Sequence, residues 1–396
     1  MIPLRRDKNF LLLLSGQVVS SAGDHIQDFA FLLLVLAMTG SAAHSGFVLG
    51  LNTAAYLLFG LVAGALADRW DRRRTMIWCE LGRGALAGAV ALALWLDRLT
   101  LPHLYAVAAL TGVLTTLFQA AGTAALPAIV GPGRLTRALG VTQGVLNTLR
   151  VAGATIAAFV HGFGRSAPFL VNAVSFVISA ATLRLMTPSF QAGPADEPAR
   201  VTTEIRDGLG WLWRQPAIRL LTLLQTGDNL RYGAGYLVIV TLAQGAGASP
   251  AQIGLIFSGA AVGALAGSLL ADRAARRFPL GGIAVVMLWL EALTFPLYAL
   301  APGPPALGLV AAAESVIAPV FAVAVTTHRL AVTPDRLRGR TSAAVQTLTM
   351  GALSVGTMLG GALISAIGAH AATFALGGWL ALLALLATAN RQIRTA

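Results

Sequence analysis

Apolar runs long enough to cross a membrane recur along the whole chain. A helix needs about twenty mostly apolar residues to cross ~30 Å of hydrocarbon, and runs of eighteen or more residues repeat along this sequence. They lack the alternation of membrane β-barrel strands, and lipid admits only helices or closed barrels. The pattern predicts an all-α membrane protein with twelve transmembrane helices, over residues 10–38, 46–67, 76–96, 103–126, 137–160, 167–187, 218–242, 252–271, 281–300, 306–330, 342–366 and 370–389.

Composition agrees with a membrane protein and excludes a nucleic-acid binder. Hydrophobic residues make up 56% of the chain, charged residues 11%, and the mean hydropathy is +0.75. The net charge of +12 does not form a patch interleaved with aromatic residues; the basic residues cluster at helix ends. Of the 28 lysines and arginines, 23 lie at the termini, in the even-numbered connections or beside them. By the positive-inside rule both termini are cytoplasmic. The arginine-rich usage, with Lys8 the only lysine, favours a GC-rich bacterial genome, and we therefore expect a bacterial inner membrane.

The connection between the sixth and seventh spans is the longest. It begins at Pro188 with proline, glycine and acidic residues and then becomes amphipathic around Leu209 and Leu212. Such a pattern is typical of a linker followed by a helix on the membrane surface. We therefore expect a six-helix N-terminal half over residues 1–187, a cytoplasmic linker with an amphipathic helix over 188–217, and a six-helix C-terminal half over 218–396.

The two halves repeat one another. A Gly-Asp pair, an Ala-Asp-Arg triplet and an Arg-Arg pair each occur twice at an offset of 204 residues, and three further matches occur at an offset of 203. Two six-helix halves in parallel orientation imply a pseudo-two-fold axis along the membrane normal, with a substrate path at their interface. The matches are 23–24 with 227–228, 67–69 with 271–273, 72–73 with 276–277, Arg137 with Arg340, Gln143 with Gln346, and Gly153 with Gly356.

The connection after the second span carries a glycine, an Asp-Arg pair and a basic cluster, at Gly64, Asp68, Arg69, Arg72 and Arg73. A weaker copy after the eighth span holds Asp272, Arg273 and Arg276. This connection resembles the signature loop of the major facilitator superfamily. Four further phrases make the chain most similar to the branch that holds macrolide-efflux proteins and the enterobactin exporter: residues 40–42, 126–130, 169–176 and 337–342.

The resemblance covers essentially the whole chain and implies a transporter that works by rocking of two halves. In the superfamily these loops hold the cytoplasmic side shut. We therefore expect Asp68 to bind the positive end of a neighbouring helix, and the arginines at 69, 72 and 73 to pair with acids across the halves. The sequence departs from the family pattern at Asp71, at Gly153-Ala154, and in span four, which holds no arginine. These departures concern the coupling mechanism more than the fold.

Spans one and seven each carry a stripe of polar residues on one helix face. The spacing of i, i+3, i+4 and i+7 aligns the side chains, and a polar stripe on an apolar helix belongs against water or protein. Since the two spans are repeat partners, we expect both stripes to face one central cavity. The stripes are Gln17, Ser20, Ser21, Asp24 and Asp28 in span one, and Gln225, Asp228, Asn229, Tyr232 and Tyr236 in span seven.

The acids in these stripes are the candidate coupling residues. A carboxyl group in a poorly solvated pocket can take up and release a proton near neutral pH, and its ionised form attracts a cationic substrate. Competition between the two would couple export to a proton gradient. The alternative is an internal ion pair: Arg231 lies three residues from Asp228 and can reach it along the helix.

Other polar residues within spans extend the candidate site. Arg150 shares a face with Gln143 and Asn147 and can balance Asp24 or hold an anionic group of a substrate. Glu314 lies in span ten, which lines the cavity in the superfamily. Glu80 and Arg83 form an i, i+3 pair with a structural role, and Glu291 in span nine has no evident partner. Asn52, Tyr56 and Gln346 complete the predicted cavity lining.

These features favour a secondary active transporter, a proton-coupled exporter of amphipathic small molecules such as antibiotics or siderophores. Two alternatives remain: a lipid or lysolipid translocator, and a membrane receptor or scaffold that binds without flux. No Gly-x-x-x-x-Gly-Lys motif is present, so ATP does not drive the chain by itself. No nucleophile, base and oxyanion donor occur together, so we expect no enzyme activity. We expect no metal or cofactor, and a monomer whose partners are substrate, protons and lipid.

Overall fold

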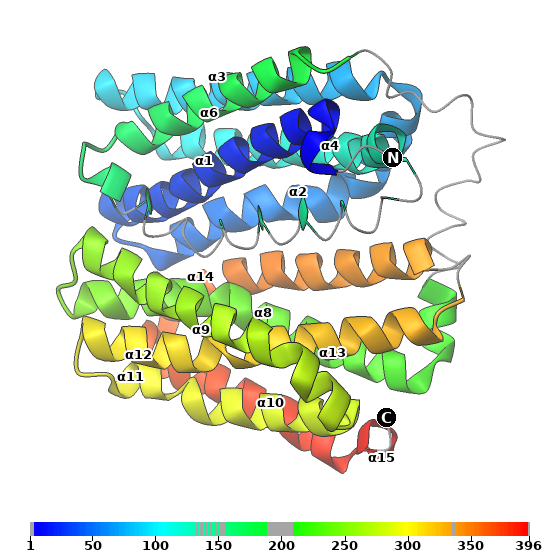
Figure 1. Ribbon diagram of the computed structural model, residues 1–396. Helices are drawn as coiled ribbons and strands as arrows, with labels where there is room; N and C mark the ends of the chain where they lie inside the picture. The colour runs from blue at the N-terminus through cyan, green and yellow to red at the C-terminus, as the bar shows by residue number, and fades with distance from the viewer. Residues whose placement is uncertain are drawn as a thin grey trace. The chain divides into compact units, whose positions relative to one another are not determined.

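The computed structural model consists of helices throughout the part of the chain that it describes (Figure 1). That part is residues 4–394 except 132–133, 135–137, 139–140, 143–144, 147–148, 150–155, 158, 188–208 and 335–337. The helices are η1 (Leu4–Arg6), α1 (Lys8–Thr39), α2 (Ala42–Arg69), α3 (Arg72–Trp95), α4 (Leu101–Val130), α6 (Ala167–Arg184), α8 (Pro216–Gly245), α9 (Pro250–Arg277), α10 (Leu280–Thr294), α11 (Leu297–Leu300), α12 (Pro304–Ser315), α13 (Ile317–Val332), α14 (Arg338–Ala389) and α15 (Arg391–Arg394).

Nine described segments are long and apolar enough to cross a membrane. The last of them, Ala344–Ala389, is interrupted at Gly368, whose φ of 79° ends one helix between the two spans predicted there. Helix α8 is 30 residues long, and its polar stripe keeps it out of the nine. The predicted all-α membrane fold is confirmed. The described helices are consistent with twelve spans, since the fifth, 137–160, falls largely outside the described residues.

Short polar residues fix where several helices begin. The Asp71 side chain accepts a hydrogen bond from the Arg74 amide at 2.7 Å and caps α3. Ser249 caps α9 in a capping box with Gln252. Each cap satisfies backbone N–H groups that have no partner within the helix. Asp71 stands where the signature loop usually has a glycine, and its side chain caps α3 at that position.

Contacts divide the chain into two compact units. The first comprises residues 1–38 and 51–198, and the second comprises 39–50 and 199–396. In the first unit α3 packs against both α4 and α6 (Figure 1). In the second, α8 packs on α14 and α9 packs on α12 and α13. The start of α2 belongs to the second unit, where the Ser354 hydroxyl donates to the Gly50 carbonyl at 2.8 Å.

Small residues bring α9 and α12 into backbone contact. Gly259, Gly263 and Gly267 lie one turn apart on α9, and each faces a backbone carbonyl of the segment that begins with α12. A β-carbon at any of the three would overlap the neighbouring backbone. This is the close approach expected of small residues at four-residue spacing in membrane helices.

The end of the predicted linker packs into the protein core. Residues 188–208 lie outside the described part of the chain, and 209–214 are helical. Leu212 is fully buried against Ile218 and Val345. The apolar face of this segment is therefore anchored in the second unit at Leu212, a contact that the prediction of a surface helix did not include.

Candidate functional site

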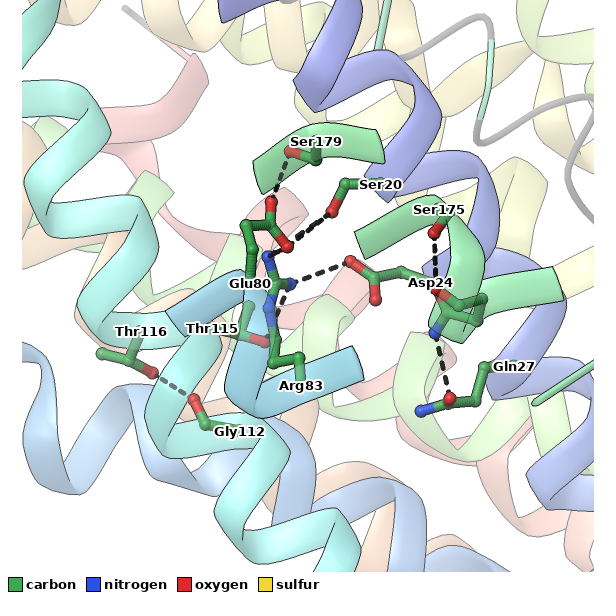
Figure 2. A network of polar contacts seen from close by, with 11 residues as sticks. Ser20, Asp24, Gln27, Glu80, Arg83, Gly112, Thr115, Thr116, Ser175 and Ser179 are labelled. Carbon is green, nitrogen blue, oxygen red and sulfur yellow. Dashed lines mark hydrogen bonds and ion pairs between the residues drawn. The ribbon is translucent and has the colours of Figure 1, made fainter. Parts of the chain in front are cut away.

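Arg83 on α3 is the centre of a polar cluster in the first unit (Figure 2). Its guanidinium lies 3.2 Å from the Asp24 carboxylate of α1 and 2.7 Å from the Glu80 carboxylate one turn back on α3. It also donates to the Thr115 hydroxyl of α4 at 3.3 Å. One buried side chain thus joins three helices of the unit, and a buried cation needs such partners to offset its lost hydration.

Two aromatic rings hold the same guanidinium from its faces. The carbon at its centre lies 4.4 Å from the Phe176 ring of α6 and 4.9 Å from the Phe118 ring of α4. Cation–π contacts of this kind are worth about 2 kcal/mol when they are desolvated. The rings and the carboxylates together fix the orientation of Arg83.

The two acids around Arg83 have different environments. Glu80 is fully buried, and Ser179 of α6 donates to it at 2.7 Å in addition to Arg83. The side chain of Asp24 is 30% exposed. Glu80 therefore anchors Arg83, whereas Asp24 retains access to a proton or a ligand. The sequence identified the Glu80–Arg83 pair but not the bond that joins it to Asp24.

Asp24 lines a cavity of about 120 Å³ within the first unit. The polar stripe of α1 contributes Gln17, Ser20 and Ser21 to its wall, and α4 contributes a second stripe. That second stripe is Thr115, Gln119 and Thr123, spaced four residues apart. This stripe was not predicted from the sequence, because none of its residues is charged; their i, i+4, i+8 spacing was the available signal. The volume holds several waters or one polar group of a larger ligand.

Arg231 on α8 is the centre of a second cluster, in the second unit. Its guanidinium lies 2.7 Å from Asp228 on the same helix, 3.1 Å from Glu291 on α10 and 2.7 Å from Glu314 on α12. The ion pair with Asp228 that the spacing allowed is therefore present. Glu291, which had no partner in the sequence, belongs to this cluster.

Tyr298 on the short helix α11 completes the second cluster. Its hydroxyl donates to the Glu314 carboxylate at 2.6 Å, and its ring packs edge-on against Phe295, with centroids 5.5 Å apart. The Phe295 ring also lies 5.3 Å from the Arg231 guanidinium. Three carboxyl groups thus surround one cation in a setting closed by aromatic rings. Tyr298 was not identified from the sequence.

The remaining candidates of the two stripes have varied positions. Asp28 is half-buried and makes no hydrogen bond or ion pair with another described residue. The Asn229 amide donates to the Gln225 carbonyl of its own helix at 2.8 Å. The Tyr232 ring is 55% exposed. Tyr236 packs on the Phe257 ring of α9 at 4.9 Å. That the two stripes face one shared cavity stays a prediction.

Further candidates are less constrained. Asn52 and Tyr56 are partly buried on α2, and the Asn52 carbonyl closely approaches Gly112 of α4. Gln346 is exposed on α14. Gln143, Asn147 and Arg150 lie outside the described residues.

The arginines of the first signature loop bind the ends of helices within their own unit. Arg72 donates to the Ala124 carbonyl of α4 at 2.9 Å. Arg73 donates to the Leu183 carbonyl at 2.8 Å and to the Arg184 carbonyl, both at the end of α6. Unpaired carbonyls at a helix end attract cations, and the pairing of these arginines with acids of the other half stays a prediction. Arg69 and Arg273 are exposed and Gly64 has open space beside it, while the side chains of Asp68, Asp272 and Arg276 lie outside the described part.

Comparisons with known proteins identify relatives along the full chain. The family model of the Major Facilitator Superfamily matches residues 13–230. The chain is similar to the multidrug efflux pump Tap of Mycobacterium tuberculosis, at 26% identity over 92% of this chain and 89% of that protein. It is 22% identical to macrolide efflux protein A of Streptococcus pyogenes, over 55% of this chain and 54% of that protein. A crystal structure of a bacterial homologue of the human lysosomal transporter Spinster, 14% identical and covered over 98% of both chains, has the same fold, with a TM-score of 0.77.

Proposed function

We propose that this chain, which belongs to the Major Facilitator Superfamily, is a proton-coupled exporter of amphipathic small molecules. The observation that carries the proposal is the position of Asp24. One of its carboxylate oxygens lies 3.2 Å from Arg83, and its partly exposed side chain forms part of the wall of a polar cavity. This carboxylate is accessible to ligands and at the same time charge-balanced within the protein.

The Asp24–Arg83 pair supports competition between a proton and a cargo. When Asp24 is ionised, it stabilises Arg83 and attracts a cationic group entering the cavity. When Asp24 takes up a proton, the attraction for the cargo is lost, and Arg83 keeps its bond to Glu80 at 2.7 Å. Glu80 thus prevents the guanidinium from becoming an unpaired buried cation, which is the costly event in such clusters.

The class of cargo is supported by the relatives. One is named as a multidrug efflux pump and another as a macrolide efflux protein. At identities of 26% and 22%, these names support a class of cargo and no particular compound. The same proposal includes export across a bacterial cytoplasmic membrane by a monomer with both termini in the cytoplasm. It also includes closure of the cytoplasmic side through the two basic loops.

Transport by everted membrane vesicles that contain the full chain tests the proposal. An acid-inside pH gradient should drive accumulation of a cationic amphipathic dye, and a protonophore should abolish it. Asp24→Asn should lose this accumulation and retain downhill flux. Asp97→Asn is the matched control: it makes the same chemical change at an exposed residue with φ 53°, a conformation that asparagine tolerates well.

Four outcomes contradict the proposal. Accumulation by Asp24→Asn equal to that of the unaltered protein removes Asp24 from the mechanism. Indifference to the protonophore removes proton coupling. Translocation of fluorescent lipid in reconstituted vesicles without dye flux favours a lipid translocator, and dye binding without any flux favours a receptor.

A further inference from the structure

Three buried carboxyl groups surround one arginine in the second unit, so the formal charges do not balance. The guanidinium nitrogens of Arg231 lie 2.7 to 3.1 Å from carboxylate oxygens of Asp228, Glu291 and Glu314. Glu291 is 1% exposed. Were all three acids ionised, two negative charges would remain uncompensated within the membrane protein. Uncompensated buried charge costs several kcal/mol for each ion. One bound proton removes half of this excess, and the remaining negative charge lies on the acids that keep some exposure, Asp228 at 14% and Glu314 at 10%.

Hydrogen bonding shows where an extra proton cannot lie. One oxygen of Glu314 accepts from Arg231 at 2.7 Å, and the other accepts from the Tyr298 hydroxyl at 2.6 Å. A carboxyl group that receives a donor on each oxygen is best satisfied in the ionised form. Glu314 is therefore the anionic partner of Arg231, and the proton belongs to one of the other two acids.

Asp228 and Glu291 approach the same atom of Arg231. Nη2 lies 2.7 Å from Oδ1 of Asp228 and 3.1 Å from Oε2 of Glu291, but only the first has hydrogen-bond geometry. Both carboxyl groups therefore lie against one nitrogen of Arg231, and Oε2 of Glu291 has no hydrogen-bond partner among the described residues. Two carboxyl groups held at one cation repel each other unless one of them carries a proton.

We infer that Asp228 and Glu291 share one proton, and that this pair is a second proton-binding site of the transporter, apart from Asp24. The inference rests on the proposed function only for its use in transport. The charged and titratable groups that contact the pair or Arg231 are Tyr232 on α8, Tyr298 on α11 and Glu314 on α12. Two further helices pack on α10: α13, which carries His328 and Arg329, and α15, which carries Arg391 and Arg394. Helix α14, which packs on α8 and α10, holds only His370 between residues 344 and 389.

The consequence is a division between the two units. The acid of the first cluster is open to a cavity, whereas Glu291 is sealed from solvent in this conformation. Its proton can exchange only when α8 and α10 separate, which is a movement that accompanies a change of state. A proton bound in this way is carried with the conformational cycle and does not compete directly with cargo.

Infrared difference spectroscopy on the purified full chain in lipid nanodiscs tests the shared proton. Between neutral and alkaline pH, the unaltered protein should show the carbonyl band of a protonated carboxylic acid. Glu291→Gln and Asp228→Asn should each lose that band, because the amide of either variant supplies the missing donor without a titrating proton. Glu314→Gln is the matched control and should retain the band, since it leaves both acids of the pair in place; its carbonyl oxygen replaces only one of the two acceptor oxygens of Glu314.

The outcomes separate this inference from the proposed function. Absence of the band in the unaltered protein, or its loss only in Glu314→Gln, overturns the shared proton. Asp24→Asn should leave the band unchanged, and its loss there would assign the proton to the first cluster instead. Since two variants address the same pair, one that does not insert leaves the other to decide. A transport failure at Asp24 does not alter this reading.

In vesicles, Glu291→Gln should keep downhill dye flux and lose the dependence of flux on pH that remains in Asp24→Asn. A purely structural role predicts equal loss of flux at every pH, and that result would exclude use of the pair in the cycle.

Discussion

Asp24 on α1 and Arg83 on α3 form an ion pair in the first unit, and the repeat-related helices of the second unit carry the pair with the charges exchanged. At the offset of 204 residues, α1 corresponds to α8 and α3 to α10. In the second unit the cation, Arg231, lies on α8 and its acid partner Glu291 on α10, 3.1 Å apart. Each unit thus has a bridge between the same two repeat-related helices, although its ends are not at equivalent positions, since Asp24 corresponds to Asp228 and Arg83 to Met287.

The exchange makes the two units chemically unequal. In the first, an acid lies at the cavity and a cation is buried behind it; in the second, the cation is surrounded by acids. Each bridge holds a unit together internally.

The first prediction concerns the stability of the first unit. Arg83→Met keeps an apolar stem between Phe118 and Phe176 but leaves Glu80 without its cation. Loss of one partner from a buried pair costs about 3–5 kcal/mol. Cys79, the only cysteine, is 4% exposed, so the temperature at which a maleimide dye labels it reports unfolding in detergent.

Adding Glu80→Gln to Arg83→Met should recover most of that loss, because the buried acid is then neutral. If the single variant unfolds at the temperature of the unaltered protein, the Arg83–Glu80 pair does not stabilise the unit. A double variant no better than the single one would place the stability in the cation–π contacts instead.

The second prediction concerns Tyr298. Tyr298→Phe removes the hydroxyl that donates to Glu314 at 2.6 Å and leaves one carboxylate oxygen unsatisfied. Hydrogen bonds to charged groups contribute about 1.5–3 kcal/mol, and we expect a loss of that size in the same thermal labelling measurement. Tyr232→Phe, at a ring that is 55% exposed, is the control and should change little. Equal effects of the two variants would show that the hydroxyl bond contributes nothing specific.

The third prediction concerns the contact between α9 and α12. A β-carbon at Gly263 would lie 2.8 Å from the carbonyl carbon of Ala312, closer than real contacts allow. We expect Gly263→Ala to destabilise the protein by about 1–3 kcal/mol through overpacking, measured as a lower unfolding temperature.

The matched control is Gly88→Ala on α3, which has open space around it. Alanine favours a helix over glycine by about 0.4–1 kcal/mol, so Gly88→Ala should be neutral or stabilising. If both alanine variants shift the unfolding temperature in the same direction, the close contact between α9 and α12 does not determine the effect of Gly263→Ala.

The sequence predicts helices and their faces well, because both follow from periodicity within one segment. The break at Gly368 falls between two predicted spans, and the glycines of α9 face a neighbouring backbone as their spacing indicates. Partners from other segments were not predictable. Asp24 and Arg83 are 59 residues apart, and Arg231 and Glu314 are 83 apart. A helical face states which side of a helix is polar, but the partner depends on which helices pack together and in what register.

The same limit applies at the signature loop. The pattern of charges suggested acids as partners for Arg72 and Arg73, and the structure adds carbonyl acceptors on α4 and α6 that the pattern did not suggest. Backbone carbonyls occur at every position of a sequence, so a pattern of side chains cannot single them out. Glu291 likewise showed only that a charge in a span needs a partner, which Arg231 supplies from another helix.

The last prediction separates cargo charge from proton coupling at Asp28. This acid lies one helical turn beyond Asp24 on α1, half-buried, and no described residue bonds to it. An ionised carboxylate attracts a positively charged cargo, and at an effective dielectric constant near 20 this attraction reaches roughly 4 kcal/mol at contact. Allowing for screening by water, Asp28→Asn should raise the KM for a cationic dye about tenfold.

An uncharged analogue of the dye distinguishes the two roles. Its KM should be unchanged in Asp28→Asn, and Asp97→Asn should alter neither compound. Equal losses for the charged and the neutral compound would mean that Asp28 acts through the proton, because a proton site affects every cargo alike. An unchanged KM for both would leave Asp24 as the only acid of the α1 stripe that meets the cargo. The ratio of the two KM changes therefore shows whether Asp28 binds the charge of the cargo or the coupling proton.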